Sequence, residues 1–243
     1  MLRLKELDIV ESREVLSTLP QGKKMINTIN AHSYNTALKD TLFAESLKNC
    51  DALIPDGASI VKACKLLKAK SQPVERIAGW DLFILEMEKL NANGGGVCFF
   101  MGSTNEVLSL IRERAAKDYP NIQIKTYSPP YKPQFSDEDN NEIITQINQA
   151  KPNLLWIGMT APKQEKWVYE NWAKLDISCH VGTIGAVFDF YAGTVKRAPI
   201  WWQRHSLEWL YRLLKEPKRM WRRYIIGNIL FLYNILCEKL SKK

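Results

Sequence analysis

Asp56 is the residue whose type and position best suit acid–base chemistry. It directly follows a short apolar run, at Pro55-Asp56-Gly57, and a carboxylate at a strand end can act as a general base toward a hydroxyl. Alternatively, Asp-Gly is simply a good turn dipeptide. Arg76 offers a similar choice, because a guanidinium group can bind a phosphate or face the solvent.

Three arginines near the C-terminus suit phosphate binding. Arg212, Arg219 and Arg222 are spaced by seven and three residues, so they can share one helical stripe unless Pro217 turns the chain away. Guanidinium groups that converge on one site would bind a diphosphate and neutralise it as a leaving group. A basic surface that faces a membrane is the alternative interpretation, and the two are compatible.

Four more polar residues lie near predicted strand ends: Thr28, Asn30, Gln164 and Asp189. Thr28 and Asn30 could contact a sugar or a phosphate, although a turn role is the default. Gln164 lies in the first turn of a helix behind Pro162, and a helix N-terminus suits an anion. A glutamine that faces the solvent is the commoner case.

Several motif matches carry little weight. Gly94-Gly95-Gly96 precedes its strand, so it is not a dinucleotide fingerprint. Asp137-Glu138-Asp139 matches the metal-binding DxD of many sugar transferases, but it follows Ser136 at a helix start, where acidic residues favour the helix dipole regardless. The five cysteines include no CxxC pair, so we expect reduced thiols and neither a disulfide framework nor a metal site.

Alternating strand and helix patterns must position these residues. Apolar runs predict strands at 25–29, 51–54, 97–101, 122–125, 154–158 and 177–181. Helical patterns predict helices at about 33–48, 59–68, 81–90, 106–117, 137–150 and 163–173. Such alternation predicts an α/β fold, a Rossmann-like and mostly parallel sheet with helices on both faces. Ligands of these sheets lie beyond the carboxyl ends of the strands.

Charge divides the chain near Thr194. Residues 196–243 hold 12 Lys/Arg, 3 Asp/Glu and four of the eight Trp, whereas residues 1–195 are nearly neutral. We therefore expect an α/β core, 1–195, and a basic helical appendage, 196–243, that meets phosphate groups of a ligand or a membrane surface. The longest apolar run, Ile225 to Leu236, is too short to cross a bilayer. The first six residues lack the apolar core of a signal peptide, so we expect a cytoplasmic protein.

The chain resembles the WecG/TagA/CpsF glycosyltransferase family. The shared segments follow the family's order and cover nearly the whole chain: Thr28-Ile29-Asn30, Pro55-Asp56-Gly57, Glu75 to Leu82, Pro162-Lys163-Gln164-Glu165, Phe188-Asp189 with Ala192-Gly193, Arg197-Ala198-Pro199, and Leu207 to Leu213. Each segment alone would be weak evidence, but together they are highly specific. Departures at Ala58-Ser59, Thr160-Ala161 and His205-Ser206 leave the transferred sugar open.

The resemblance implies a GT-E type fold and an inverting, metal-independent glycosyltransferase without a cofactor. The enzyme would move a sugar of the N-acetylmannosamine type, its uronic acid, or glucose. The donor would be a UDP-sugar, and the acceptor an undecaprenyl-diphosphate-linked saccharide in cell-surface polysaccharide or teichoic acid synthesis. The resemblance further implies a homo-oligomer attached peripherally to the anionic inner face of the cell membrane, with no nucleic acid partner.

Residue by residue, the resemblance assigns catalytic roles to Asp56, Arg76, Arg212, Arg219 and Arg222. Asp56 becomes the general base, and Arg76 a phosphate or acceptor contact. The other three arginines match a mobile appendage that closes over the diphosphate.

Substrate-binding roles follow for the remaining four residues. Thr28 and Asn30 would contact the donor sugar, while Gln164 and Asp189 would lie near the nucleotide. The rival interpretation is a non-catalytic protein whose basic tail binds anionic lipid or nucleic acid. It explains the charge partition but not the polar residues at the strand ends. A nicotinamide-dependent oxidoreductase lacks its glycine fingerprint.

Overall fold

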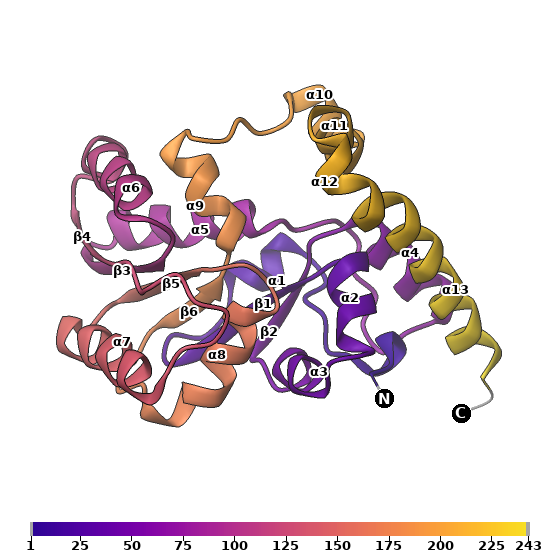
Figure 1. The fold of residues 1–243 in the computed structure, drawn as a ribbon, viewed down its shortest axis with the longest axis horizontal. Helices are drawn as coiled ribbons and strands as arrows, with labels where there is room; N and C mark the ends of the chain where they lie inside the picture. Colours follow the sequence, from indigo (N-terminus) through magenta and orange to yellow (C-terminus); the bar gives the residue numbers. More distant parts are fainter. Residues whose placement is uncertain (1, 242–243) are drawn as a thin grey trace.

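A six-stranded, all-parallel sheet forms the centre of the molecule, as the sequence predicts (Figure 1). The computed structural model describes residues 2–241, so Met1 and residues 242–243, at the outer ends of the expected core and appendage, lie outside it. The strands run in the order β2-β1-β6-β5-β3-β4. They are β1 (Lys24–Ile29), β2 (Ala52–Pro55), β3 (Gly96–Gly102), β4 (Ile122–Tyr127), β5 (Leu154–Gly158) and β6 (His180–Thr183).

Helices cover both faces of the sheet (Figure 1). One face carries α1 (Arg13–Ser17), α5 (Gly79–Ala92), α6 (Asn105–Asp118) and α9 (Gly185–Ala192). The other carries α2 (Ala31–Ala37), α3 (Thr41–Lys48), α4 (Ala58–Leu67), α7 (Asp137–Ala150) and α8 (Lys163–Asn171), with short 3-10 turns η1 (Leu4–Glu6) and η2 (Trp172–Lys174). The chain then continues through α10 (Ile200–Arg204), α11 (Glu208–Lys215), α12 (Pro217–Trp221), the π-helical turn η3 (Arg222–Ile226) and α13 (Gly227–Leu240).

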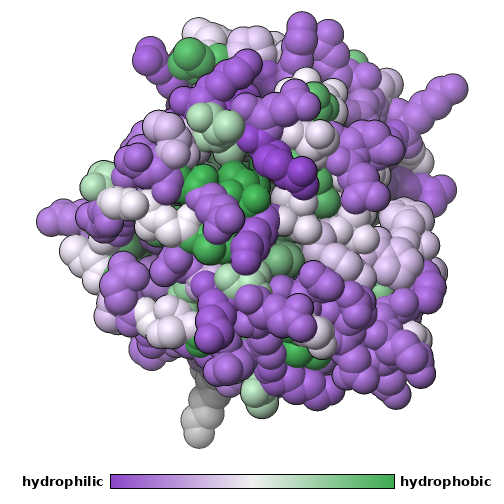
Figure 2. Space-filling model, turned by 90° about the vertical axis from the view of Figure 1, so that its left-hand side faces the viewer, coloured by the Kyte–Doolittle hydropathy of each residue, from purple (hydrophilic) through white to green (hydrophobic). Residues whose placement is uncertain are grey.

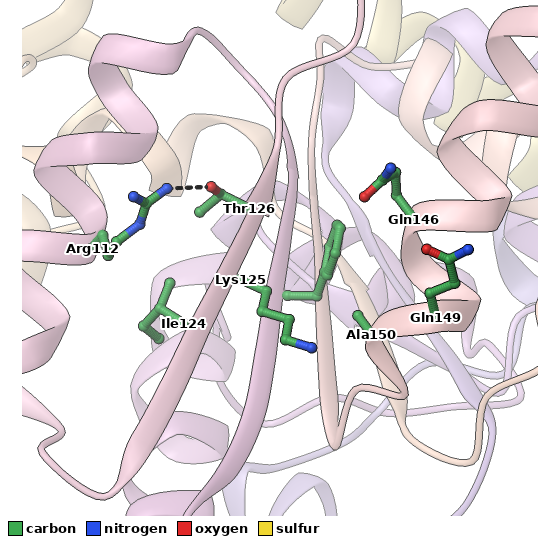
Figure 3. A pocket seen from close by; sticks show the side chains of 8 residues that line it. Arg112, Ile124, Lys125, Thr126, Gln146, Gln149 and Ala150 are labelled. Atoms are coloured by element: carbon green, nitrogen blue, oxygen red, sulfur yellow. Dashed lines mark hydrogen bonds between the residues drawn. The ribbon is translucent and has the colours of Figure 1, made fainter.

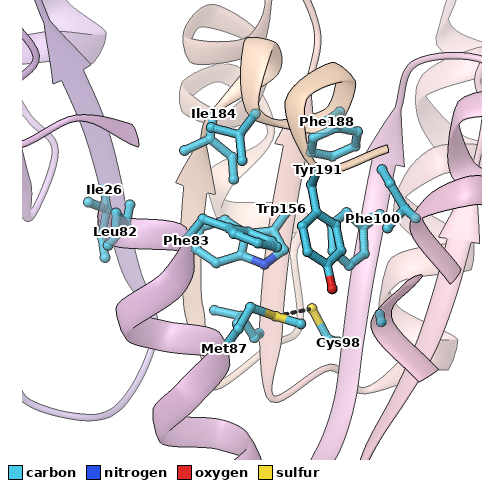
Figure 4. Close-up of a cluster of buried hydrophobic side chains, with 14 of the residues drawn as sticks. Ile26, Leu82, Phe83, Met87, Cys98, Phe100, Trp156, Ile184, Phe188 and Tyr191 are labelled. Atoms are coloured by element: carbon cyan, nitrogen blue, oxygen red, sulfur yellow. Dashed lines mark hydrogen bonds between the residues drawn. The ribbon is translucent and has the colours of Figure 1, made fainter. Parts of the chain in front are cut away.

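An aromatic core fixes α5 and α9 against the sheet (Figure 4). The rings of Phe83 and Tyr191 have centroids 4.8 Å apart, and Phe83 also packs on Trp156. A Cβ on Gly158 would lie 2.4 Å from the ring of Phe188, so this strand residue must be glycine for α9 to pack so closely. Burying each such ring contributes about 1.5–3 kcal/mol. These contacts hold α9, which begins directly after β6, against the sheet.

Two predicted elements are wrong in extent. The single helix at 33–48 is two helices, α2 and α3, because Asp40 caps α3 by accepting a hydrogen bond from Phe43 N at 3.0 Å. The last strand is His180–Thr183 rather than 177–181. Gly182 breaks the apolar pattern within it, since a Cβ there would lie 2.3 Å from the Trp156 ring.

The C-terminal helix α13 packs against α2 and α4 (Figure 1). Its Phe231 and Ile235 are buried in the same cluster as the residues of those helices. Glu238 accepts hydrogen bonds from Leu4 N at 3.0 Å, Lys5 N at 2.8 Å and Tyr34 Oη at 2.6 Å. The end of the expected appendage thus joins the start of the chain. Among the described residues, none of the helices combines the length and apolar character that a membrane span requires.

Candidate active site

Asp56 and Arg76 meet at the carboxyl end of β2. Ile77 N donates to Pro55 O at 3.1 Å, which brings the segment before α5 alongside the end of this strand. Arg76 Nη2 then donates to Asp56 Oδ1 at 3.1 Å. Burial raises the pKa of Asp56, while Arg76 opposes this shift and the nearby Glu208 adds to it. Ionised in this setting, Asp56 is a stronger proton acceptor than an ordinary surface aspartate.

Glu208, the first residue of α11, brings the appendage to this site. It is 7% exposed. Its Oε2 accepts from Arg76 Nη2 at 3.1 Å, and its Oε1 accepts from Arg212 Nη2 at 3.4 Å. Arg197 Nη2 lies 3.9 Å from Oε2. Because a buried carboxylate is costly unless it is paired, these three guanidinium groups stabilise α11 at the edge of the sheet of its own chain.

Two aromatic side chains support the arginines. Arg197 lies over the Trp80 ring, 4.9 Å from its centroid, and Arg212 lies 4.9 Å from the centroid of the Phe190 ring on α9. Such cation–π contacts are worth about 0.5–2 kcal/mol each. Burial lowers the pKa of Arg197, and its Nε has no hydrogen-bond partner among the described residues. A buried guanidinium with an unpaired N–H suits an anionic ligand.

Asn30 lies beside Asp56 because β1 and β2 end in register. A Cβ on Gly57 would lie 3.4 Å from Asn30 Cβ. Asn30 Oδ1 accepts from Ser33 N at 3.1 Å and so caps α2, which is the local role that the sequence allowed. Thr28 is partly exposed one residue before the end of β1.

Gln164 is buried and connects two strand-end loops. Its Oε1 accepts from Met159 N at 3.2 Å and from Gly185 N at 3.1 Å, and its Nε2 donates to Glu165 Oε1 at 2.8 Å. A Cβ on Gly185 would lie 2.1 Å from Met159 O, so the two loops can meet only at a glycine. In this structure Gln164 shapes the loops after β5 and β6.

Asp189 lies on α9 and faces the appendage. It is partly buried, and burial raises its pKa, while Thr194 and the Arg219 guanidinium oppose the shift. The charge of Arg219, in the appendage, therefore reaches Asp189, although no ion pair joins the two among the described residues.

Arg219 and Arg222 do not share a stripe with Arg212. Pro217 begins the new helix α12, so the chain turns after α11. The two arginines instead line a groove of about 550 Å³ between α2 and the appendage. Its lining residues are His32, Asn35, Thr36, Lys39, Asp40, Arg219, Arg222, Arg223, Ile226, Gly227 and Leu230.

An exposed apolar surface continues from this groove along η3 and α13. It consists of residues that are each 49% or more exposed: Ile225, Ile226, Ile229, Leu232, Tyr233, Leu236 and Leu240. The face of the molecule at the β4 edge is, by contrast, mostly hydrophilic around a small apolar patch (Figure 2).

A second hollow, of about 390 Å³, lies at the β4 edge (Figure 3). It is lined by polar side chains such as Lys125, Gln146 and Arg112, which donates to Thr126 Oγ1 at 2.7 Å. None of the predicted site residues lines it, so the carboxyl edge at β1 and β2 is the stronger candidate for the active site.

The DxD match has a structural role. Asp139 N donates to Ser136 Oγ at 3.2 Å, and Ser136 N donates to Asp139 Oδ2 at 2.9 Å, a capping box at the start of α7. Asp139 also pairs with Lys132 at 2.8 Å. The interpretation as a helix start is confirmed.

Sequence reasoning assigned no role to Glu208 or Arg197. A signal for Glu208 existed, because it is one of only three acidic residues in a strongly basic segment and stands four residues before Arg212. On a helix this spacing makes the two neighbours. Arg197 lies in the shared segment Arg197-Ala198-Pro199, but its place beside Glu208 depends on the contacts with Trp80 and Phe190, which no spacing indicates.

The fold is that of an α/β protein, and comparison with known proteins gives its class. The family model described as "Glycosyl transferase WecG/TagA/CpsF family" matches residues 2–243, and the chain belongs to this family. Membership in a glycosyltransferase family sets aside both the non-catalytic binding protein and the oxidoreductase.

Three relatives share the name N-acetylglucosaminyldiphosphoundecaprenol N-acetyl-beta-D-mannosaminyltransferase. The protein from Bacillus subtilis (strain 168) is 30% identical over 90% of this chain and 81% of its own length. The protein from Bacillus spizizenii (strain ATCC 23059 / NRRL B-14472 / W23) is 33% identical over 85% of this chain and 77% of its own length. A Staphylococcus aureus (strain MW2) protein is 29% identical over 88% of this chain and 80% of its own length.

Proposed function

We propose that this enzyme transfers an N-acetylmannosamine-type sugar from a UDP-sugar to an undecaprenyl-diphosphate-linked N-acetylglucosamine, with inversion at the anomeric carbon. One observation carries the proposal: Asp56, the candidate base, shares Arg76 with Glu208, and Glu208 gathers Arg197 and Arg212 at the same place. A proton acceptor beside several guanidinium groups suits transfer from a nucleotide diphosphate. The names of the relatives supply the sugar and the acceptor.

Asp56 takes the proton of the acceptor hydroxyl as that oxygen attacks the anomeric carbon. The bond from this carbon to the UDP oxygen breaks, and the electron pair leaves with UDP. Arg76, Arg197 and Arg212 stabilise the negative charge that develops on the diphosphate, a task that a divalent cation performs in many sugar transferases. On this account the reaction needs no metal, and activity persists in excess EDTA.

The groove lined by Arg219, Arg222 and Arg223 receives the diphosphate of the lipid-linked acceptor. Arg223 Nε is buried and has no partner among the described residues, so it is ready to donate to a phosphate oxygen. The exposed apolar surface of α13 continues from the groove. Apolar side chains beside basic ones suit a helix that lies in the headgroup region of an anionic membrane. We propose peripheral attachment to the inner face of the membrane on this basis.

Mass spectrometry of the products tests the proposal directly. The purified enzyme is incubated with a panel of UDP-sugars (N-acetylmannosamine, its uronic acid, and glucose) and a lipid-diphosphate-linked N-acetylglucosamine in vesicles. We expect a product one N-acetylmannosamine heavier, formed with and without EDTA. Transfer of another sugar would correct the donor alone. No transfer, together with no affinity for UDP, would refute the proposal. The homo-oligomer stays a prediction, which sedimentation measures.

A further inference from the structure

Glu208 has a central position among the charged groups of the site. Its carboxylate oxygens lie 3.1 Å from Arg76, 3.4 Å from Arg212 and 3.9 Å from Arg197. The Arg76 nitrogen that contacts Glu208 also contacts Asp56, at 3.1 Å. One buried carboxylate therefore joins guanidinium groups from three separate segments: the stretch before α5, the stretch before α10, and α11 itself.

These contacts use few of the available donors. A guanidinium group carries five N–H donors in a planar fork, and Arg76, Arg197 and Arg212 each face Glu208 through Nη2. Arg197 Nε is buried and unpaired among the described residues. Glu208 thus orients the arginines while other donors remain for phosphate oxygens.

We infer that Glu208 is a positioning residue of the transfer reaction, which holds Arg76 and Arg212 against Asp56 and keeps Asp56 a competent proton acceptor. The inference rests on the proposed role of Asp56 as the general base. Glu208 itself contacts neither substrate in this account. It acts through the neighbours whose geometry and charge it sets.

The charges around Asp56 explain how Glu208 keeps Asp56 a competent proton acceptor. Asp56 faces the cations Arg76 and Arg212 and the anion Glu208. Glu208 in turn faces Arg76, Arg197 and Arg212. The Glu208 charge raises the pKa of Asp56, whereas the two arginines lower it. Without that charge the arginines act on Asp56 uncompensated, so its pKa falls and it becomes a weaker base.

The pH dependence of kcat/KM separates this role from simple packing. Glu208→Gln removes the charge at almost unchanged size, and we expect kcat to fall about 10²-fold and the acidic limb of the profile to move to lower pH. Glu208→Asp keeps the charge but shortens the side chain. We expect its acidic limb to stay at the wild-type pH and its kcat to fall less than that of Glu208→Gln. The matched control is Glu113→Gln, which removes an exposed carboxylate on α6 and should change neither quantity.

Carboxyl ¹³C NMR of Asp56, assigned with Asp56→Asn, follows the same effect without turnover. We expect its titration to move to lower pH in Glu208→Gln. If both the limb and the titration stay in place, Glu208 only packs and the inference is overturned, whatever happens to kcat. Should Glu208→Gln not fold, an acidic limb displaced in Glu208→Asp, which keeps the charge, would overturn it equally. A wild-type protein that transfers no sugar but shows the NMR shift in the variant would refute the proposed function, and it would leave only the effect of the Glu208 charge on Asp56 standing.

Discussion

Asp56→Asn should abolish most turnover without disturbing the fold. The amide cannot accept the acceptor's proton, and general base catalysis contributes about 10²–10⁴-fold. We therefore expect kcat to fall by that factor, which corresponds to about 3–5 kcal/mol of activation free energy. The loss should appear in kcat rather than in the KM for the donor.

The structure also limits the effect of Asp56→Asn on stability. Arg76 Nη2 can still donate to the amide oxygen that takes the place of the carboxylate oxygen, and it keeps its contact with Glu208. Because burial raises the pKa of Asp56, its charge does not stabilise the folded protein at neutral pH, and removing the charge should not destabilise it. We expect the Tm to change by no more than about 3 °C, equivalent to about 1 kcal/mol.

Three measurements decide between a catalytic and a structural role for Asp56. Turnover is followed by UDP release, UDP affinity by calorimetry, and Tm by circular dichroism. The matched control is Asp137→Asn, an exposed carboxylate in the first turn of α7, which should keep activity within about twofold if the DxD match is only a helix start. A fully active Asp56→Asn protein would refute the assignment of Asp56 as the general base. Loss of UDP affinity and of Tm together would show that Asp56 holds the site's structure instead.

Three further predictions concern pH, the membrane and the core. Burial raises the pKa of Glu165 to about 7, so its neutral form is favoured in the folded protein and stability should decline as pH rises from about 4.5 to 7. Glu165→Gln should then add about 1–3 kcal/mol to the free energy of urea unfolding at pH 8 and little at pH 4.5; equal effects at both would contradict this. Replacing Arg219 and Arg222 by Ala should weaken sedimentation with anionic vesicles, by about 1 kcal/mol per residue, and leave neutral vesicles unaffected. Phe231→Ala should cost about 3–5 kcal/mol of unfolding free energy, because this side chain is 2% exposed and packs edge-on against Tyr34; a cost below about 1 kcal/mol would show that α13 is not part of the core.

The sequence predicts the sheet well because buried parallel strands are continuous apolar runs. Five of the six strands lie within one or two residues of their predicted ends. The sixth was misplaced because Gly182 breaks the pattern, and its reason is the Trp156 ring on the neighbouring strand. The break between α2 and α3 was missed because Asp40 resembles an ordinary polar residue of a helix surface. The first error comes from a contact that no local window contains, whereas the second comes from a local cap between Asp40 and Phe43 that was not recognised.

The site was predictable to the extent that strand ends define it. Asp56 could be placed at the carboxyl edge from the short apolar run before it. Its partner Arg76 is 20 residues away in sequence, and the backbone bond between Ile77 and Pro55 joins them, which no spacing indicates. Gln164 was placed correctly in the first turn of α8, but its contacts within the protein depend on the loop after β6.

The corner at Glu216 and Pro217 decides how the basic charge is divided. Pro217 offers no backbone N–H and disfavours helical geometry at the residue before it; Glu216 accordingly has φ −133° and ends α11. A straight helix would have placed all three arginines on one stripe, where they could neutralise one diphosphate. With the corner, Arg212 faces Glu208 near Asp56, whereas Arg219 and Arg222 line the groove beside α2. On the proposed function this division has a purpose, because both the donor and the acceptor carry a diphosphate. The two must be held apart at the distance that the transferred sugar and the acceptor sugar span together.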